Sequence, residues 1–458
     1  MYYDSKDKEF RKHGGTNMAV LTFKGGIHPH NDGKDLSKAT PITDYTPVGE
    51  IVIPMAQHIG APASPLVKKG DRVLVNQKIG AAAGFISANI HSPVSGIVKN
   101  VEPRLTAGGT KVLSVIIEND GMNETVPVTD ERGAEDLTKE EKLNLIQEAG
   151  IVGMGGAGFP TNVKLSPKNA DEIEYYIVNG AECEPYLTSD YRRMIESPEA
   201  IVKGVKIALS LFGKAKAIIA IEDNKRDAIV KMKEAVKGDP DIAVKTVYTK
   251  YPQGGERTLI YALTGRMVNS SMLPADVNCV VNNIDTVYAI YDAVENRRPL
   301  TERIVTVTGD AINNPQNFRV PIGTNLAELV DAAGGFKSEP EKLISGGPMM
   351  GIALYDLNIP VTKGTSALLC FTRDEVRENE PSNCINCGRC VSVCPGRIMP
   401  ARLSVLAEHG DKEGFQALNG MECCECGCCT FICPAKRPLT QAFKQMRQAV
   451  AAERRKKK

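Results

Sequence analysis

The spacing of apolar positions changes along the chain. Between residues 41 and 120, short apolar runs separated by turns predict strands at residues 50–54, 72–75, 96–99 and 112–117. From residue 138 to about 300, apolar strand patterns alternate with amphipathic helical patterns, which predicts an α/β domain. Residues 1–40 are polar and glycine-rich, and we expect an N-terminal arm that lies on the domain after it.

Local signals divide the rest of the chain. Thr138 and Glu141 have the spacing of a helical capping box, and we expect the helix to end at Gly150. Residues 121–137 are a polar, acidic linker. Residues 301–372 combine short strands with one helix, which predicts a small β-grasp. Helical patterns at 401–409, 412–418 and 439–455 complete a last module over 373–458, so the fold class is multidomain α/β.

Eight of the thirteen cysteines form two copies of one spacing. In two-cluster ferredoxins, the spacing C-x-x-C-x-x-C-x-x-x-C-P holds [4Fe–4S] clusters, and the fourth cysteine of each run ligates the other cluster. We therefore assign the first cluster to Cys384, Cys387, Cys390 and Cys433. The second cluster is assigned to Cys423, Cys426, Cys429 and Cys394.

Other uses of these cysteines fit less well. Structural zinc also uses C-x-x-C pairs, but four ligands suffice for it and the duplicated Cys-Pro endings are then unexplained. A disulfide framework is typical of short secreted domains. Cys424 and Cys428 lie next to expected ligands, and either would replace a ligand if the loop slipped by one residue. We favour the alternative that both are small buried residues beside the cluster.

Composition limits the partners and the location. Charged residues make up 24% of the chain and the net charge is +1, which argues against nucleic acid as a partner. No run of about 18 apolar residues is present, so we expect no membrane span. Residues 1–7 lack the apolar core of a signal peptide. Reduced cysteines that carry clusters indicate the cytoplasm.

Gly153, Gly155 and Gly158 match the pattern G-x-G-x-x-G. A dinucleotide-binding fingerprint follows a strand, whereas a predicted helix precedes this one, so we discard a plain Rossmann interpretation. The physical property of the loop remains, because glycine backbone can approach a phosphate or a flat ring closely and offer it N–H groups. Polar residues also follow the predicted strand at 175–178, where α/β sheets bind ligands.

Four segments of the α/β domain occur in a characteristic order. They are Gly155-Gly156-Ala157-Gly158-Phe159 with Lys164, Asn179-x-x-Glu182-x-Glu184, Tyr251-x-x-x-Gly255-Glu256, and Asn282-Asn283-x-x-Thr286. Together they resemble the NADH-oxidising flavoprotein subunit of respiratory complex I. The resemblance implies that FMN and NAD(H) are bound by Gly153, Gly155, Gly156, Gly158, Phe159, Lys164, Asn179, Glu182, Tyr251, Gly255, Glu256, Asn282, Asn283 and Thr286.

Individual roles also follow from the resemblance. The glycine loop and Lys164 would hold phosphates, and Phe159 would lie near the adenine of NAD(H). Glu184 would lie beside the isoalloxazine and the nicotinamide, as the catalytic residue. The chain departs from the family pattern at Ala181, where the family has an acidic residue, and at Arg257, where it has a second glutamate.

The flanking domains resemble known modules too. Residues 67–73 and 91–96 are similar to a biotinyl/lipoyl-type barrel-sandwich hybrid, in which a hairpin lysine carries a swinging arm. Here that position falls on Phe85, so we expect a structural domain without the modifiable lysine. Residues 301–372 resemble the SLBB domain, a β-grasp, and we expect it to serve in packing.

The order of all five parts resembles one family. The order of parts is similar to that in the C subunit of Rnf complexes. It runs from an arm with Gly25-Gly26-Ile27-His28-Pro29 through a lipoyl-like domain, a flavin domain and an SLBB domain to a ferredoxin-like module with two [4Fe–4S] clusters. The resemblance implies an NAD-linked oxidoreductase subunit of an ion-translocating ferredoxin:NAD⁺ oxidoreductase. Electrons would arrive from ferredoxin through an iron–sulfur partner subunit, and membrane subunits would move Na⁺ or H⁺. The chain would be peripheral, on the cytoplasmic side of the membrane.

Three alternatives stay open. Cobalamin reductases share the flavin, SLBB and two-cluster parts. A soluble NADH dehydrogenase subunit of a hydrogenase or a formate dehydrogenase is the second alternative. The third is a non-enzymatic electron relay that has lost nucleotide binding.

Overall fold

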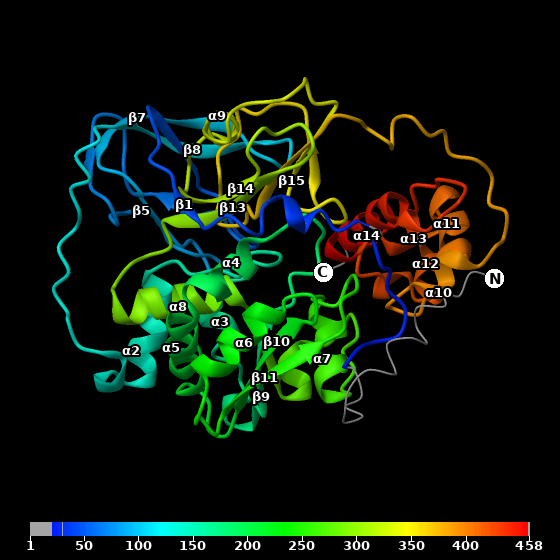
Figure 1. The fold of residues 1–458 in the computed structure, drawn as a ribbon, viewed down its shortest axis with the longest axis horizontal. Helices are drawn as coiled ribbons and strands as arrows, with labels where there is room; N and C mark the ends of the chain where they lie inside the picture. The colour runs from blue at the N-terminus through cyan, green and yellow to red at the C-terminus, as the bar shows by residue number, and fades with distance from the viewer. Residues whose placement is uncertain (1–20, 30, 457–458) are drawn as a thin grey trace.

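The computed structural model describes residues 21–29 and 31–456, and most of the expected arm, residues 1–20, lies outside that range. Figure 1 shows the last module, in orange and red, to one side of the other three domains. The described part of the arm, in blue, begins beside α7 (Glu256–Thr264), runs along the module and continues to the SLBB sheet. Within the described residues, no helix is long and apolar enough to cross a bilayer.

The lipoyl-like domain is built from two small antiparallel sheets. One sheet has the order β2-β8-β7-β4 and the other β3-β5-β6. Their strands are β2 (Glu50–Pro54), β3 (Ser64–Pro65), β4 (Arg72–Val73), β5 (Lys78–Ala81), β6 (Ile90–His91), β7 (Gly96–Leu105) and β8 (Lys111–Asn119). Every predicted strand is present, and β7 and β8 extend further than expected as one long bulged hairpin. Phe85 is exposed at the hairpin where the family carries its lysine.

The flavin domain contains a four-stranded parallel sheet of order β11-β10-β9-β12. Its strands are β9 (Tyr175–Gly180), β10 (Lys216–Glu222), β11 (Ile242–Val247) and β12 (Cys279–Asn283). Its helices are α2 (Lys139–Glu148), α3 (Thr161–Lys164), α4 (Ser189–Glu196), α5 (Pro198–Leu209), α6 (Arg226–Ala235), α7 and α8 (Ile284–Glu295). The capping box predicted at Thr138 and Glu141 is confirmed, and Gly150 follows α2 with a positive φ of 64°.

The SLBB domain is a six-stranded mixed sheet, of order β1-β14-β13-β17-β15-β16, with helix α9 (Leu326–Ala332) packed on it. Its strands are β1 (Thr43–Asp44), β13 (Glu302–Thr308), β14 (Gln316–Pro321), β15 (Lys342–Ser345), β16 (Ile352–Leu354) and β17 (Ala367–Phe371). Strand β1 lies inside the range that the sequence assigns to the lipoyl-like domain. It pairs instead with β14, because an edge strand offers the passing chain unpaired backbone groups.

The position of the arm also differs from the one expected from the sequence. The sequence places it on the lipoyl-like domain that follows it, but Leu21 bridges Val247 and Ile27 bridges Tyr251, both in the flavin domain. Strand β11 is the edge of the flavin sheet, so its free backbone groups are available for pairing. The arm is therefore part of the flavin domain's surface.

The last module is helical. Its elements are α10 (Arg389–Ser392), α11 (Pro400–Glu408), α12 (Lys412–Ala417), α13 (Cys428–Phe431) and α14 (Leu439–Lys456). Leu403, Phe415, Phe443 and Val450 form its apolar core together with cysteines of both runs. The three predicted helices are confirmed, and the two short helices inside the cysteine runs were not predicted because single turns leave no periodic pattern.

Candidate functional site

Two predicted segments meet at the carboxyl ends of neighbouring strands. Strands β9 and β12 are parallel, and Asn179 is the register partner of Asn283. Asn283 also caps α8, since its side-chain oxygen accepts hydrogen bonds from the backbone N–H groups of Asp285 and Thr286. Open α/β sheets bind ligands at this edge, and a helix N-terminus there favours an anion.

The glycine loop lies across the N-terminus of α8. The backbone N–H of Met154 donates to the Thr286 hydroxyl at 3.0 Å. A Cβ on Gly155 would stand 3.0 Å from the Asn283 Cβ, whereas a Cβ on Gly156 would meet no atom within 4 Å. The loop is thus packed on one side and open on the other. Gly158 has a φ of +68° and its Cβ would approach His58 of the lipoyl-like domain at 3.1 Å.

Lys164 and Glu256 form the outer side of this region. The Lys164 ammonium lies 2.8 Å from a Glu256 carboxylate oxygen, and both side chains are partly exposed. Gly255 precedes helix α7 at its N-cap position, and Phe159 is half-buried. A lysine held by a single exposed carboxylate can exchange that partner for a phosphate at little cost.

A partly buried chain of hydrogen bonds connects Asn283 to Glu182. The Asn283 amide donates to the Asp190 carboxyl at 2.6 Å, and the Asp190 backbone N–H donates to Glu182 at 2.8 Å. Glu182 has a φ of +48°, a conformation unusual for a glutamate. Burial, and then the charge of Glu182, raise the pKa of Asp190 to about 8. Asp190 was not predicted from the sequence, because nothing but its acidic side chain in the first turn of α4 distinguishes it.

Two buried lysines hold the backbone of this segment. The Lys34 ammonium donates to the carbonyl oxygens of Glu182 at 2.9 Å, Glu184 at 2.9 Å and Leu187 at 2.5 Å. The Lys225 ammonium donates to the Ala181 carbonyl at 2.7 Å. Burial lowers the pKa of Lys34, and the nearby Glu182 carboxylate opposes that shift. Because buried charges are tolerated only with partners, these lysines fix the loop after β9. The sequence carried no motif that marked them.

Glu184 is held by the SLBB domain. Its carboxylate accepts hydrogen bonds from the backbone N–H groups of Met349 at 3.2 Å and Met350 at 3.0 Å. Burial raises the pKa of Glu184 to about 7. A Cβ on Gly347 would stand 2.2 Å from a Glu184 oxygen, so a side chain there would displace the carboxylate. The SLBB domain was expected to serve in packing, but it also holds the Glu184 carboxylate. The sequence signal that could have indicated this role is the glycine-rich segment Gly346-Gly347-Pro348-Met349-Met350-Gly351.

The second cysteine run packs against Tyr251. Cys426 and Cys428 form an apolar cluster with Tyr251 and Ile27, and Cys183 and Met349 pack against it. The Cys428 sulfur lies 3.8 Å from the Tyr251 carbonyl oxygen. A Cβ on Gly427 would approach the Met349 carbonyl oxygen at 3.1 Å. The structure thus brings a residue predicted to bind FMN into contact with the loop predicted to bind a cluster.

The four cysteines assigned to the first cluster surround one cavity. Cys384, Cys387, Cys390 and Cys433 all line a hollow of about 410 Å³, its open mouth included. Four thiolates that line one open hollow suit an iron–sulfur cluster. Of the second set, Cys394, Cys423 and Cys429 lie together beside the module's apolar core, whereas Cys426 lies in the cluster around Tyr251. Cys428 is fully buried, as expected, whereas Cys424 is exposed, so the expectation that both are buried is wrong for Cys424.

Polar atoms without partners support a polar ligand at the strand ends. The Asn282 side-chain oxygen and the Tyr251 hydroxyl are both buried and have no hydrogen-bond partner within the described structure. Buried polar atoms are normally hydrogen-bonded. Both residues belong to the predicted flavin set, so the donor set and the open side of the glycine loop fit a phosphate-bearing aromatic cofactor.

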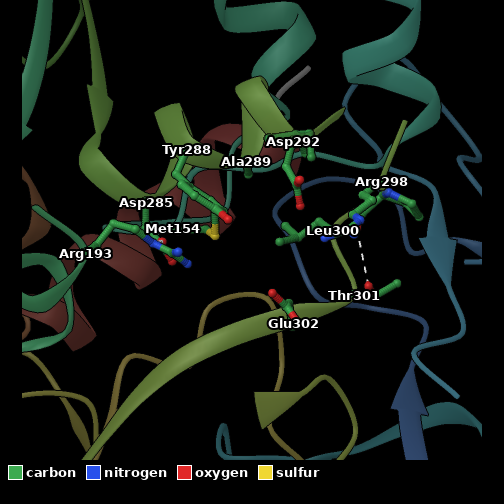
Figure 2. Close-up of a pocket in the computed structure, with 12 residues that line it drawn as sticks. Met154, Arg193, Asp285, Tyr288, Ala289, Asp292, Arg298, Leu300, Thr301 and Glu302 are labelled. Atoms are coloured by element: carbon green, nitrogen blue, oxygen red, sulfur yellow. Dashed lines mark hydrogen bonds and ion pairs between the residues drawn. The ribbon is translucent and has the colours of Figure 1, made fainter. Parts of the chain in front are cut away.

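Figure 2 shows a separate pocket between α8 and the start of β13. Its volume is about 330 Å³ with its open mouth included. Arg193 and Asp285 point toward one another in it, with their Nε and Oδ1 atoms 2.8 Å apart. Arg303 shares the same carboxylate. Met154 is the one glycine-loop residue that lines this cavity, and none of the residues predicted to bind a cofactor does. The cavity therefore lies behind the flavin region and is not part of it.

Comparison with family models assigns each domain. Residues 21–122 match the RnfC barrel sandwich hybrid domain and residues 146–292 match the Nuo51 FMN-binding domain. Residues 304–353 match the SLBB domain, and residues 379–398 match a 4Fe-4S binding domain. The first match begins at Leu21, so it includes the described arm.

Curated relatives cover almost the whole chain. The C subunit of the Na⁺-translocating ferredoxin:NAD⁺ oxidoreductase complex of Acetobacterium woodii is 44% identical, over 96% of this chain and 99% of that protein. The C subunit of the proton-translocating complex of Clostridium ljungdahlii is 46% identical, over 87% and 86%. The C subunit of the ion-translocating oxidoreductase complex of Rhodobacter capsulatus is 41% identical, over 93% and 82%.

A solved NAD⁺-reducing [NiFe]-hydrogenase has a chain with a TM-score of 0.49 and 22% identity, covering 63% of this chain and 55% of that chain. That likeness is too low to add to the identification. The domains and their sites define an iron–sulfur flavoprotein oxidoreductase, an electron-transfer subunit with an FMN-binding domain and a [4Fe–4S]-binding domain. The chain belongs to the C-subunit family of ion-translocating ferredoxin:NAD⁺ oxidoreductase complexes, the Rnf complexes.

Proposed function

We propose that this chain passes electrons between two [4Fe–4S] clusters, FMN and NAD(H), as the peripheral subunit of a membrane-bound ferredoxin:NAD⁺ oxidoreductase. The observation that carries the proposal is the contact between the second cysteine run and Tyr251. It joins a candidate cluster ligand set to a candidate flavin site. An electron-transfer protein needs its redox groups side by side, and a protein that merely stored clusters would have no reason to bury them against a nucleotide site.

FMN would be held at the carboxyl ends of β9 and β12. Gly153, Gly155, Gly156 and Gly158 would offer backbone N–H groups, and Lys164 would contact phosphate after leaving Glu256. The rest of the FMN molecule would be surrounded by Asn179, Glu182, Tyr251, Gly255, Asn282, Asn283 and Thr286. A bound flavin exchanges electrons in pairs with a nicotinamide and singly with clusters. A nicotinamide transfers only pairs and a cluster only single electrons, so the flavin has to connect them. Glu184 would orient the nicotinamide beside it, and Phe159 would lie near the adenine of NAD(H).

The eight cysteines of the two runs would hold two clusters. The assignment of the first cluster is supported by the cavity that its four cysteines line together, Cys384, Cys387, Cys390 and Cys433. Cys394, Cys423, Cys426 and Cys429 are supported by the repeated spacing. Reduction of NAD⁺ needs two electrons and one proton and yields NADH, and two clusters that each carry one electron supply the pair. With the second cluster beside Tyr251, the first would be the outer one.

The relatives' names support the wider setting. One is described as Na⁺-translocating and another as proton-translocating, so the coupling ion of this chain stays open between the two. We propose that an iron–sulfur subunit accepts electrons from ferredoxin and passes them to this chain, and that membrane subunits couple the transfer to ion movement. The chain would lie on the cytoplasmic side of the membrane.

Cofactor analysis with redox titration tests the proposal. After anaerobic purification, iron, sulfide and flavin are measured and NADH is added during EPR. We expect about eight irons per chain, the content of two cubanes, one non-covalent FMN and two cluster signals that NADH reduces. Eight irons without flavin, and without reduction by NADH, would contradict the nucleotide site and leave a ferredoxin-like relay.

A further inference from the structure

The described arm runs along the flavin domain on one of its sides. Leu21 bridges Val247 in parallel, and the Tyr248 backbone N–H donates to the Leu21 carbonyl at 3.0 Å. Ile27 and Tyr251 exchange two backbone hydrogen bonds, of 2.8 and 2.9 Å. This pairing attaches the arm to the segment that carries Tyr251.

On its other side the same arm contacts the cluster module. The Gly26 backbone N–H donates to the Val393 carbonyl at 2.8 Å. A Cβ on Gly25 would stand 3.0 Å from the Cys394 carbonyl oxygen, and a Cβ on Gly26 would stand 2.7 Å from the Tyr251 carbonyl oxygen. Both glycines have a φ of +85°. The two glycines therefore let the backbone of the arm pass between a flavin-site residue and a cluster ligand with no space for a side chain.

Two buried lysines keep the arm in this place. The Lys250 ammonium donates to the carbonyl oxygens of Phe23 and, at 3.0 Å, of Gly25. It also lies over the Phe23 ring, 3.9 Å from its centroid. Further along, Lys34 holds the loop from Glu182 to Leu187 through three carbonyl oxygens. Moving the arm would leave the Lys250 ammonium without its partners, and the carbonyl oxygens that Lys34 holds without their donor, which is costly.

We propose that the described arm, residues 21–29 and 31–34, is a positioning element that fixes the flavin site against the second cluster. This inference rests on the proposed function. Gly25 and Gly26 act by position, through Tyr251 and Cys394, and touch no substrate. Electron transfer slows steeply as the distance between two redox groups grows. A segment hydrogen-bonded to both sides of the junction therefore sets the rate at which electrons cross it.

Glycine-to-alanine variants of the cluster-loaded full chain test the inference. Gly26→Ala introduces a Cβ against the Tyr251 carbonyl oxygen. Gly238→Ala is the matched control, because Gly238 has nearly the same φ, +83°, and its Cβ would meet no atom within 4 Å. Both variants therefore carry the same backbone strain from a positive φ. They differ in that only Gly26→Ala places a Cβ against the Tyr251 carbonyl oxygen.

The first measurement is hydrogen exchange by mass spectrometry, which does not depend on activity. We expect the backbone amides at positions 26, 27 and 251 to exchange about tenfold faster in Gly26→Ala, as loss of about one hydrogen bond implies, and to be unchanged in Gly238→Ala. The second measurement is stopped-flow reduction by NADH. We expect flavin reduction at the wild-type rate and cluster reduction that is slower by about tenfold.

The outcomes separate the two proposals. Wild-type exchange and wild-type cluster reduction in Gly26→Ala would overturn the positioning role. If NADH reduces no flavin even in the wild-type chain, the proposed function fails, while faster exchange would still support the arm's structural contact. Should Gly26→Ala not fold, Lys250→Met removes the hydrogen bonds to Phe23 and Gly25 without adding a Cβ, and the same exchange increase is expected.

Discussion

The carboxylate of Glu184 accepts a hydrogen bond from the backbone N–H of Met350 at 3.0 Å, although the two residues lie in different domains. The other carboxylate oxygen accepts from Met349 at 3.2 Å. Met349 also packs in the apolar cluster around Tyr251 and Cys426. The SLBB loop therefore contacts both the segment proposed to orient the nicotinamide and the loop proposed to hold the second cluster.

Gly347→Ala tests whether this loop positions Glu184. The added Cβ would stand 2.2 Å from a Glu184 oxygen and displace the carboxylate. We expect NADH–ferricyanide activity to fall on the order of tenfold to a hundredfold, the effect of a small displacement at a reacting centre. Gly364→Ala, in the same domain, is the control, because its Cβ meets no atom within 4 Å. Equal rates in the two variants would show that Glu184 needs no such support.

Serine variants of the cysteines test the crossed assignment of the clusters. Cys433→Ser and Cys384→Ser should lose the same EPR signal, and Cys394→Ser and Cys423→Ser the other, because the fourth cysteine of each run ligates the opposite cluster. Iron should fall from about eight to about four per chain in all four variants. Cys424→Ser should keep about eight irons as the matched control. If Cys433→Ser and Cys423→Ser lose the same signal, the assignment is wrong.

Lys164→Gln tests the phosphate contact. The lysine is partly exposed, and among the described residues its ion-pair partner is Glu256, so we expect the fold to be retained. Loss of a charge-assisted hydrogen bond should weaken FMN binding by about ten- to a hundredfold, or roughly 1.5–3 kcal/mol. Flavin fluorescence titration of the flavin-free chain measures this. Lys237→Gln removes a lysine from another exposed ion pair and should leave the affinity unchanged.

Lys363 predicts a pH dependence of stability. Its buried ammonium donates to the carbonyl oxygens of Asn89 at 2.6 Å and Gly150 at 2.7 Å, and burial lowers its pKa from 10.5 to about 7. Between these two values the unfolded chain binds more protons at this lysine than the folded chain does. This lysine's contribution to the free energy of unfolding therefore rises with pH across that window, and is smallest below about pH 7.

Urea unfolding from pH 7 to 10 measures the effect. We expect a rising midpoint in the wild-type chain and a flatter profile in Lys363→Met, which does not titrate. The expected slope is at most about 1.4 kcal/mol per pH unit. Lys237→Met, an exposed control, should keep the wild-type slope. Parallel profiles in all three proteins would mean that Lys363 stays charged in the folded chain.

Local chemistry was readable from the sequence. The cysteine spacing, the capping box at Thr138 and the glycine loop are patterns within a few residues, and each imposes its own backbone geometry. Order along the chain was also informative, since four short segments in sequence indicated the FMN-binding domain that the family model matches. These features determined the domain types and the class of cofactors.

Contacts between distant segments were decided only by the tertiary structure. Ile27 and Tyr251 pair across 224 positions, and Lys34 reaches carbonyl groups about 150 residues away. A backbone amide or carbonyl leaves no trace in the residue type, and a buried lysine has the same letter as an exposed one. The sequence by itself therefore determined the domain types, among them an FMN-binding domain and a [4Fe–4S]-binding domain. Packing of the arm, the SLBB loop and the cysteine module decided which of the proposed sites stand next to each other, because proximity depends on how whole domains are fitted together.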